Sequence, residues 1–431
     1  MQQLAQGKSQ IQNMSFLPLS SALAVIFAFI GLSVSGCFSG SSVEQSKLPL
    51  HSTPVATPSQ SPVATPAREI DLDNLLQESW NAYRQRFIQA DGRVIDREDS
   101  DRSTSEAQAY AMLRAVFADD PTTFARTLNW SENNLQRTVA GKRTDQLWAW
   151  KWGRDAQGNW GISDRNFASD ADIDAITALI FASRRWQRPD YLQLAQSKLQ
   201  DLWNLSTVAI PQGSRYLIPG PTDAFQERSH LLILNPSYFA PYAFRIFAQV
   251  DPARDWLSLV DSSYQVLEDS AKLSRVNLPS DWVILDTQTG DYQALPVSHS
   301  LRTEYSFNAY RVWWRLAWDA VWFQEPRATQ FLQNHLKHLQ QTWHSTKRIP
   351  AKIDLQGNPL VNYEATSQYA MLYAAFRLIE PAIATEILQQ KLLPQYQSGI
   401  WEQDSAYYTQ NLAGLGLLPP TEFAQLLQPT K

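Results

Sequence analysis

Three aspartates open the apolar stretch from Ala168 to Leu179, and their spacing is a first indication of chemistry. Asp170 and Asp174 lie four residues apart, so on a helix they share one face, whereas Asp172 points elsewhere. These acids could also serve only to cap a helix and complement its positive end. A calcium loop is excluded, because its sixth position needs glycine and its twelfth needs glutamate, and the chain has alanine and phenylalanine there.

Glu106 is a candidate general acid in the segment from Thr104 to Met112, where Tyr110 shares its helix face. A first-turn glutamate could also merely complement the helix dipole. A helix N-terminus lowers the pKa of a carboxyl group, whereas a general acid needs a raised pKa. Glu106 could therefore donate a proton only if burial or nearby carboxylates, such as Asp170 and Asp172, outweigh the dipole.

The composition excludes several classes of function. The net charge is -5 and no cluster of Lys or Arg is long enough to bind a phosphate backbone, so we expect no nucleic-acid partner. The chain has six His and no His-Glu-x-x-His motif, so we predict neither a metal site nor a cofactor. The 16 Trp and 16 Tyr favour a carbohydrate site, because flat amphipathic rings can stack against sugars.

Residues 1–37 resemble a bacterial lipoprotein signal peptide. A weakly basic start with Lys8 is followed by an apolar run from Phe16 to Leu32 and then by Val34-Ser35-Gly36-Cys37. Cys37 is the only cysteine, so a disulfide or a paired metal site cannot explain it. We predict that Cys37 is lipidated and holds the protein at a membrane outside the cytoplasm; the alternative is an uncleaved anchor helix.

Residues 38–67 are rich in Ser, Pro and Thr and contain Pro-Val-Ala-Thr-Pro twice. Such a composition predicts a disordered, semi-extended spacer of roughly 3 Å per residue. Residues 68–431 have no further break of this kind, so we predict one domain there.

Apolar residues in this domain recur every three or four positions, and strand-like alternation is rare. The pattern predicts an all-α ring of six paired helical hairpins, with the site at one end of the ring. The predicted helices are Leu75 to Gln89, Ser105 to Phe117, Pro121 to Leu135, Asp172 to Arg185, Tyr191 to Leu205, Pro236 to Ala248, Asp255 to Leu273, Tyr305 to Phe323, Ala328 to Thr342, Glu364 to Leu378, Pro381 to Gln390 and Tyr407 to Gly416.

Several short motifs of this domain resemble, in order, those of the family 8 glycoside hydrolases, which are bacterial endoglucanases with related xylanases and chitosanases. They are Ser105-Glu106, Trp148-Ala-Trp-Lys-Trp-Gly153, Ala168-Ser-Asp-Ala-Asp172, Leu234-Asn-Pro-Ser-Tyr-Phe-Ala-Pro241, Leu278-Pro-Ser-Asp-Trp282, Tyr310-Arg-Val312, Pro359-Leu-Val-Asn-Tyr-Glu364 and Tyr407-Tyr408. The resemblance implies an (α/α)6 barrel that hydrolyses β-1,4-linked glycans with inversion and without a metal.

The resemblance also implies roles for individual residues. Glu106 takes the position of the catalytic acid, and Asp170 that of the acid that holds and distorts the sugar. We expect the other side chains that bind the glycan to be Tyr110, Trp150, Asp172, Tyr238, Asn308, Arg311 and Tyr407.

Asn308 departs from the family pattern, because the best-known branch has the catalytic base, an aspartate, at this position. An amide cannot accept the proton of the attacking water. Another branch of the family recruits a carboxylate from elsewhere, so Glu304 is our tentative base, with Asp281 and Asp286 as weaker alternatives.

Together these features predict a lipid-tethered endo-glucanase that acts on a β-1,4-glucan such as cellulose. The tether favours work beside the cell's own polysaccharide, for example with a cellulose synthesis or export apparatus, over scavenging of foreign polymer. Two alternatives stay open: a glycan-binding relative that lost its base at Asn308, and a chitosanase-like or xylanase-like specificity.

Overall fold

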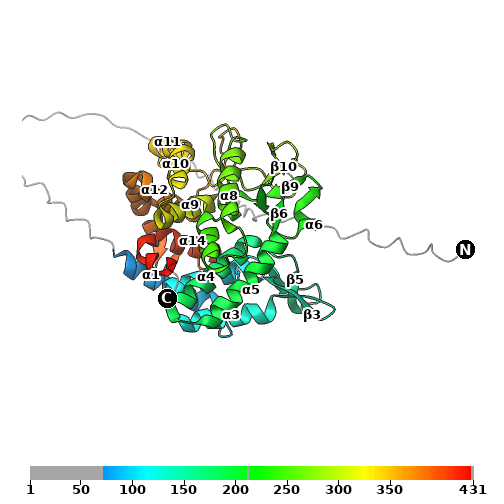
Figure 1. The fold of residues 1–431 in the computed structure, drawn as a ribbon. Helices are drawn as coiled ribbons and strands as arrows, with labels where there is room; N and C mark the ends of the chain where they lie inside the picture. Colours follow the sequence, from blue (N-terminus) through cyan, green and yellow to red (C-terminus); the bar gives the residue numbers. More distant parts are fainter. Residues whose placement is uncertain (1–70, 211–212, 429–431) are drawn as a thin grey trace, which may run out of the picture. The chain divides into compact units, whose positions relative to one another are not determined.

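The computed structural model describes residues 71–210 and 213–428, which form one unit (Figure 1). The predicted signal peptide, Cys37 and the predicted spacer lie outside the described residues. Among the described residues, no helix is both long enough and apolar enough to cross a membrane.

Two concentric sets of helices build this unit. The inner helices are α2 (Ser105–Phe117), α4 (Ser169–Trp186), α7 (Pro241–Val250), α9 (Tyr310–Phe323), α12 (Thr366–Ile379) and α14 (Tyr407–Leu417). Each inner helix contacts the next, and α14 contacts α2, so the inner ring is closed. The outer helices are α1 (Leu72–Phe87), α3 (Pro121–Asn134), α5 (Pro189–Ser206), α8 (Trp256–Ala271), α10 (Pro326–His335) and α13 (Pro381–Ile387), and each packs against one inner helix. This arrangement confirms the predicted (α/α)6 barrel.

Burial explains which helices are inside. Helix α4 is buried on all sides from Ser169 to Arg184, and nearly every side chain of α9 and α12 is buried as well. Outer helices are amphipathic instead: α5 buries Tyr191, Ala195, Leu199 and Leu202, which lie on one face. A helix that is buried on all sides must lie in the middle of the protein, whereas an amphipathic helix can face solvent. The hydrophobic pattern of each helix therefore determines whether it belongs to the inner or the outer ring.

Inner and outer helices alternate along the chain, and the connection from each inner helix to the following outer helix is short. Short connections join antiparallel helices, so all six inner helices run in the same direction. Their N-termini therefore meet at one end of the barrel, which we call the N-terminal end.

Short strands lie in the connections that lead to this end, and the sequence pattern did not predict them. One sheet has the order β1 (Ser103–Thr104), β4 (Lys151–Arg154) and β5 (Trp160–Asp164). A four-stranded antiparallel sheet has the order β11 (Tyr292–Gln293), β10 (Val283–Asp286), β9 (Leu231–Leu234) and β8 (Gln226–Arg228). Three two-stranded pairs complete them: β2 (Gln136–Val139) with β3 (Lys142–Trp148), β6 (Thr207–Ala209) with β7 (Arg215–Leu217), and β12 (Tyr396–Gln397) with β13 (Ile400–Trp401).

Three predicted helices differ most from those of the structure. The helix predicted from Pro236 is a 3-10 turn (Pro236–Tyr238) followed by α7, which begins at Pro241 because proline favours the first helical position. The helix predicted from Tyr305 begins only at Tyr310, after a loop. The helix predicted from Ala328 to Thr342 is split at Leu336 into α10 and α11 (Lys337–Thr346). A four-residue helix, α6 (Thr222–Phe225), was not predicted.

Candidate active site

Four inner helices each place one polar side chain in their first turn at the N-terminal end. Glu106, Asp170 and Arg311 are the second residues of α2, α4 and α9, and Tyr407 is the first residue of α14. Because these helices are parallel, the four residues meet although they are far apart in the sequence. Thr104 fixes the start of α2, since its side chain accepts a 3.1 Å hydrogen bond from the backbone N–H of Ala107.

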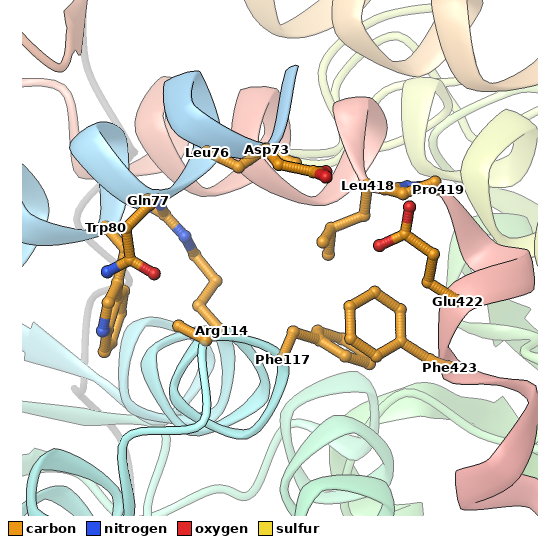
Figure 2. A pocket seen from close by; sticks show the side chains of 12 residues that line it. Asp73, Leu76, Gln77, Trp80, Arg114, Phe117, Leu418, Pro419, Glu422 and Phe423 are labelled. Atoms are coloured by element: carbon orange, nitrogen blue, oxygen red, sulfur yellow. The ribbon is translucent and has the colours of Figure 1, made fainter. Parts of the chain in front are cut away.

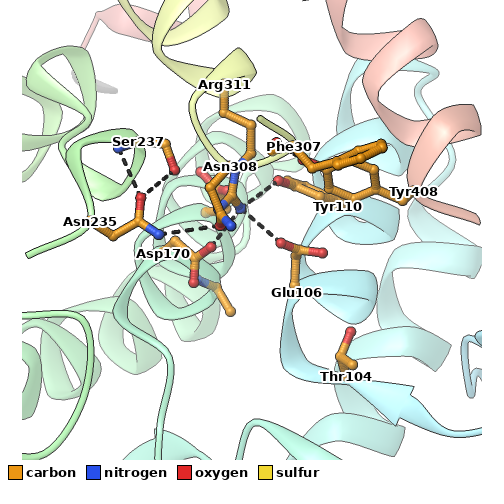
Figure 3. A network of polar contacts seen from close by, with 12 residues as sticks. Thr104, Glu106, Tyr110, Asp170, Asn235, Ser237, Phe307, Asn308, Arg311 and Tyr408 are labelled. Atoms are coloured by element: carbon orange, nitrogen blue, oxygen red, sulfur yellow. Dashed lines mark hydrogen bonds and ion pairs between the residues drawn. The ribbon is translucent and has the colours of Figure 1, made fainter. Parts of the chain in front are cut away.

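Arg311 links the two acids (Figure 3). Its Nη1 lies 2.8 Å from Oε2 of Glu106 and 2.6 Å from Oδ2 of Asp170. The side chains of Arg311 and Asp170 are each only 2% exposed. Glu106 keeps 22% of its side chain exposed, so it is the member of this group that a substrate can reach.

The environment of Glu106 resolves the conflict between its helix position and an acid role. Burial is the main cause that raises its pKa, to about 7, and the charges of Asp170 and Asp174 raise it further. Arg311 and the hydroxyl of Tyr407 lower it but do not outweigh burial. A carboxyl group with a pKa near 7 is still partly protonated at neutral pH, as a general acid must be.

Asn308 lies on the other side of Arg311, as Figure 3 shows. Its Oδ1 accepts a hydrogen bond of 2.7 Å from Nη2 of Arg311 and one of 3.2 Å from Nδ2 of Asn235. Oδ1 of Asn235 in turn accepts hydrogen bonds from the backbone N–H and the hydroxyl of Ser237. These donors fix which way each amide faces, so the acceptor oxygen of Asn308 is fully used and cannot take up a proton.

Aromatic side chains surround Arg311. The ring of Tyr238 lies 5.3 Å from its guanidinium carbon, and the hydroxyl of Tyr407 donates to Oε1 of Glu106 at 3.1 Å. Next to Asn308, Tyr408 donates a 2.7 Å hydrogen bond to the backbone carbonyl of Phe307. Tyr238 and Tyr407 therefore contact Arg311 and Glu106, respectively, and their binding of a glycan stays a prediction.

A cavity of about 380 Å³ begins at Phe307 and Tyr408, beside this network. Its lining mixes aromatic rings with carboxylates and small polar side chains: Glu98, Phe307, Tyr363, Glu364, Thr366, Ser367, Glu402, Gln403, Tyr408 and Thr409, with Ala365 and Ala406. Rings with nearby hydrogen-bonding oxygens are the chemistry that binds a sugar, and the volume is in the range of small-molecule sites.

One turn further into the barrel, a second ion pair repeats the first. Arg315 binds Asp174 with both terminal nitrogens, at 2.9 and 3.0 Å, and both side chains are almost completely buried. The Nε of Arg315 also donates to the carbonyl of Ser237 at 2.8 Å. Asp170 and Asp174 thus share a face of α4, as their spacing predicted, and pair with two arginines that are likewise four residues apart on α9.

Two predicted substrate-binding residues, Asp172 and Tyr110, are completely buried. Asp172 points away from this face: its Oδ1 accepts a 3.2 Å hydrogen bond from the backbone N–H of Trp148, and burial raises its pKa to about 8. The side chain of Tyr110 has no exposed surface, and its hydroxyl contacts Nη1 of Arg311 at 3.3 Å. Asp172 therefore ties α4 to the end of β3, and Tyr110 contacts Arg311; the contact of either side chain with a glycan stays a prediction.

The tentative base Glu304 does not belong to the network around Arg311 among the described residues. Its carboxylate pairs with Lys352 at 3.2 Å. Asp286 accepts hydrogen bonds from Gln288 and Thr289 in an exposed turn. Trp150 is half-buried beside the start of α2, where its carbonyl accepts a 3.0 Å hydrogen bond from the N–H of Ser105. Its contact with a glycan stays a prediction.

Sequence reasoning missed three parts of the site: Asn235, Tyr408 and the pair of Asp174 with Arg315. Asn235 and Tyr408 fall inside motifs that carried the resemblance, so the signal was present. The spacing of Arg311 and Arg315, which matches that of Asp170 and Asp174, could have indicated the second ion pair.

A separate cavity of about 200 Å³ lies at the C-terminal end of the inner helices (Figure 2). Its lining comes from α1, α2, α14 and the C-terminal 3-10 helix (Pro420–Leu427), and most of it is apolar. Its charged side chains are Arg114, Asp73 and Glu422. Phe117 ends α2, whereas Glu106 begins it, so this cavity is at the opposite end of the barrel from the acids. Among residues 71–210 and 213–428, no three His, Cys, Asp or Glu side chains are grouped so as to hold a metal ion.

Comparison with known proteins gives matches along most of the chain. Residues 67–420 match the family described as "Glycosyl hydrolases family 8". An endoglucanase from Xanthomonas axonopodis pv. citri (strain 306) is 36% identical over 258 residues, which cover 59% of this chain and 63% of that protein. An endoglucanase from Escherichia coli (strain K12) is 29% identical over 213 residues, or 49% of this chain and 55% of its own length. The aligned regions thus span less than two thirds of these relatives.

Solved structures give a longer match. The endo-1,4-D-glucanase of Vibrio fischeri ES114 has a TM-score of 0.65 at 25% identity, covering 79% of this chain and 93% of its own. The family 8 endoglucanase Cel10 of Klebsiella pneumoniae has a TM-score of 0.64 at 25% identity, covering 80% and 99%.

Proposed function

The chain belongs to the glycosyl hydrolases of family 8, and we propose that it is an endo-acting, inverting hydrolase of a β-1,4-linked glucan such as cellulose. The observation that carries the proposal is Glu106, an accessible carboxyl group with a pKa of about 7 beside Asp170 and Arg311. The names of the relatives support the substrate class, since those compared above are endoglucanases.

Glu106 would protonate the leaving glycosidic oxygen. Its Oε2 faces Arg311, which has only donors, so the transferable proton belongs on Oε1. There the protonated carboxyl group can donate a hydrogen bond to the hydroxyl oxygen of Tyr407, because that hydroxyl also lies 3.4 Å from Oγ1 of Thr104 and can turn its own hydrogen toward this second partner. Asp170 would keep the pKa of Glu106 raised through its charge.

This mechanism also needs a catalytic base. Inversion needs a second carboxylate about 6.5 to 9.5 Å from the acid, with the attacking water between them. Asn308 occupies the position where the resemblance puts that base, and its oxygen is already held by Arg311 and Asn235. This observation supports a second candidate function, a glycan-binding or weakly active relative.

An assay of new reducing ends on soluble β-1,4-glucans distinguishes the two functions. We expect turnover by the wild type and loss of at least about a hundredfold in Glu106→Gln, because the amide keeps the shape but has no transferable proton. Glu304→Gln tests the tentative base separately: loss of turnover would identify Glu304 as the recruited base. Binding of cello-oligosaccharides without any new chain ends would establish the non-catalytic alternative.

We further propose that Cys37 carries a lipid that anchors the enzyme outside the cytoplasm. The lipoprotein-like sequence before this single cysteine supports the proposal. Cys37→Ser should release the protein from the membrane fraction or leave the precursor uncleaved. A variant that fractionates and migrates like the wild type would contradict lipidation.

An anchored glucanase would act on polymer close to its own cell, so we propose that it trims glucan during synthesis or export. Deleting the gene should lengthen or tangle the exported glucan. An unchanged exported product, together with poor growth on added glucan, would favour scavenging instead.

A further inference from the structure

Asn308 lies in the loop from Tyr305 to Ala309, which directly precedes α9. A residue from another segment of the chain fixes the conformation of this loop. The carboxylate of Asp281, a residue of the Leu278–Trp282 motif, reaches this loop. Its Oδ1 accepts hydrogen bonds from the backbone N–H of Ala309 at 2.8 Å and of Ser306 at 3.2 Å. Its Oδ2 accepts a 2.7 Å hydrogen bond from the hydroxyl of Ser306.

These three donors flank Asn308 on both sides in the sequence. Asp281 thus holds the residues just before α9 from a distant segment of the chain. The backbone of Asp281 is fixed in turn, because its N–H donates a 2.8 Å hydrogen bond to the carbonyl of Glu304. The loop can therefore move only if Asp281 moves with it.

The sheet at the N-terminal end explains how Asp281 is held in place. Strands β9 and β10 pair in antiparallel register, with Val283 opposite Leu234. Asn235 follows directly after β9, and Asp281 lies two residues before β10. Both residues therefore lie at the same end of the β9–β10 pair. Asn235 binds the side chain of Asn308, and Asp281 binds the backbone around it.

Trp282 connects the same segment to Arg311. Its ring lies 6.0 Å from that of Tyr238, which lies 5.3 Å from the guanidinium carbon of Arg311. On its other side Trp282 stacks on Phe225, at 5.9 Å and 6° between the planes. The dipeptide Asp281-Trp282 therefore supports both Asn308 and the surroundings of Arg311.

We propose that Asp281 is a positioning residue, which sets the location of Asn308 and of the turn that carries Arg311. It is not the missing base: only 6% of the residue is exposed, and both carboxylate oxygens are already used by donors of the loop. The expected effect of Asp281 on turnover rests on the proposed function, whereas its expected effect on the loop rests on geometry alone.

The test compares Asp281→Asn and Asp281→Ala with the wild type. We expect kcat to fall about tenfold in the first and about a hundredfold or more in the second, with KM changed less than about threefold, because misplacement of groups at the reacting centre costs rate rather than affinity. Asparagine keeps one acceptor oxygen for the two backbone amides, so it should retain part of the function. Hydrogen exchange of the peptide that contains Ser306 to Ala309 should accelerate in both variants, while the rest of α9 stays protected.

Asp155 provides the matched control. Its carboxylate accepts hydrogen bonds from the N–H groups of Gln157 and Asn159, at 2.9 and 2.8 Å, and from the Asn159 side chain, but in an exposed hairpin turn. Asp155→Asn should leave kcat and the exchange of the Ser306 to Ala309 peptide unchanged. Should Asp281→Ala fail to fold, Ser306→Ala removes the hydroxyl contact alone and should still lower kcat.

Unchanged exchange in the Ser306 to Ala309 peptide of Asp281→Asn and Asp281→Ala would overturn the proposal, whatever the activity. Faster exchange with unchanged kcat would also overturn it, since the loop would then be held but not needed. If the wild type itself shows no turnover, the proposed function fails, and the exchange experiment still decides whether Asp281 fixes the loop.

Discussion

The hydroxyl of Tyr407 lies 3.1 Å from Oε1 of Glu106, although the two residues are 301 positions apart in the sequence. This hydrogen bond favours the charged form of the carboxyl group and so lowers the pKa of Glu106 against the effect of burial. The pH at which the acid loses its proton therefore depends on the last inner helix.

Tyr407→Phe should raise the pKa of Glu106 above about 7, because the variant removes a donor to the carboxylate. The alkaline limb of the kcat/KM profile, where the acid is lost by deprotonation, should move to higher pH. Tyr396→Phe is the control, since the hydroxyl of Tyr396 bonds Glu78 and the carbonyl of Leu75 on the outer helix α1. An alkaline limb that stays in place, or moves equally in the control, would contradict the assignment of Glu106.

Asn308→Asp should increase kcat by about tenfold or more, because it restores a carboxylate where the resemblance places the base. Arg311 and Asn235 already donate to this position, and they would keep the new carboxylate charged. The measurement is the initial rate of reducing-end release. Asn235→Asp is the control, because it adds the same charge at the residue that is hydrogen-bonded to Asn308. A fall in rate would instead indicate that a carboxylate from elsewhere serves as the base and that the new charge at position 308 interferes with it.

The buried pair of Asp174 and Arg315 should matter for stability more than for binding. Arg315→Met leaves a buried carboxylate without a partner and should cost about 3–5 kcal/mol in the free energy of unfolding. The double variant with Asp174→Leu removes both charges and should recover part of this loss. Denaturant unfolding measures both. Equal losses in the single and double variants would show that packing, not the unpaired charge, determines the cost.

Tyr238→Ala and Trp150→Ala should weaken binding of cello-oligosaccharides, measured by calorimetry, while the fold survives. Trp150 is partly buried, so its truncation should also reduce stability, by about 3 to 5 kcal/mol. Trp203→Ala is the control, because Trp203 packs on Trp256 between the outer helices α5 and α8. If the two site variants only unfold, or bind as well as the control does, these rings are structural.

The hydrophobic pattern was enough to predict most of the fold. Apolar residues at helical spacing gave the helices and their pairing, because burying a helix on all sides or on one face leaves a clear pattern, as in α4 and α5. The short strands could not be predicted, since strands of two to seven residues are fixed by pairing with other segments, as Val283 is with Leu234. The start of α9 was misplaced for the same reason: Asp281 holds the preceding loop from outside.

The site was predictable in kind but not in detail. The spacing of Asp170 and Asp174 correctly gave a common face, and the resemblance gave Glu106 and Arg311. The spacing also indicated that Asp172 points elsewhere, and in the structure Asp172 accepts a hydrogen bond from the backbone of Trp148. The pKa of Glu106 depends on burial, which only the packed structure supplies.

Helices α2 and α14 close the inner ring, and they lie near opposite ends of the described chain. A barrel closed in this way cannot be completed until its last helix has been made, and such long-range contacts form slowly. The acid at Glu106 also lacks its Tyr407 partner until that moment. A chain that ended before α14 would therefore form an open ring, with the apolar side chains of α2 and α12 that pack against α14 left exposed, and we expect proteases to degrade it.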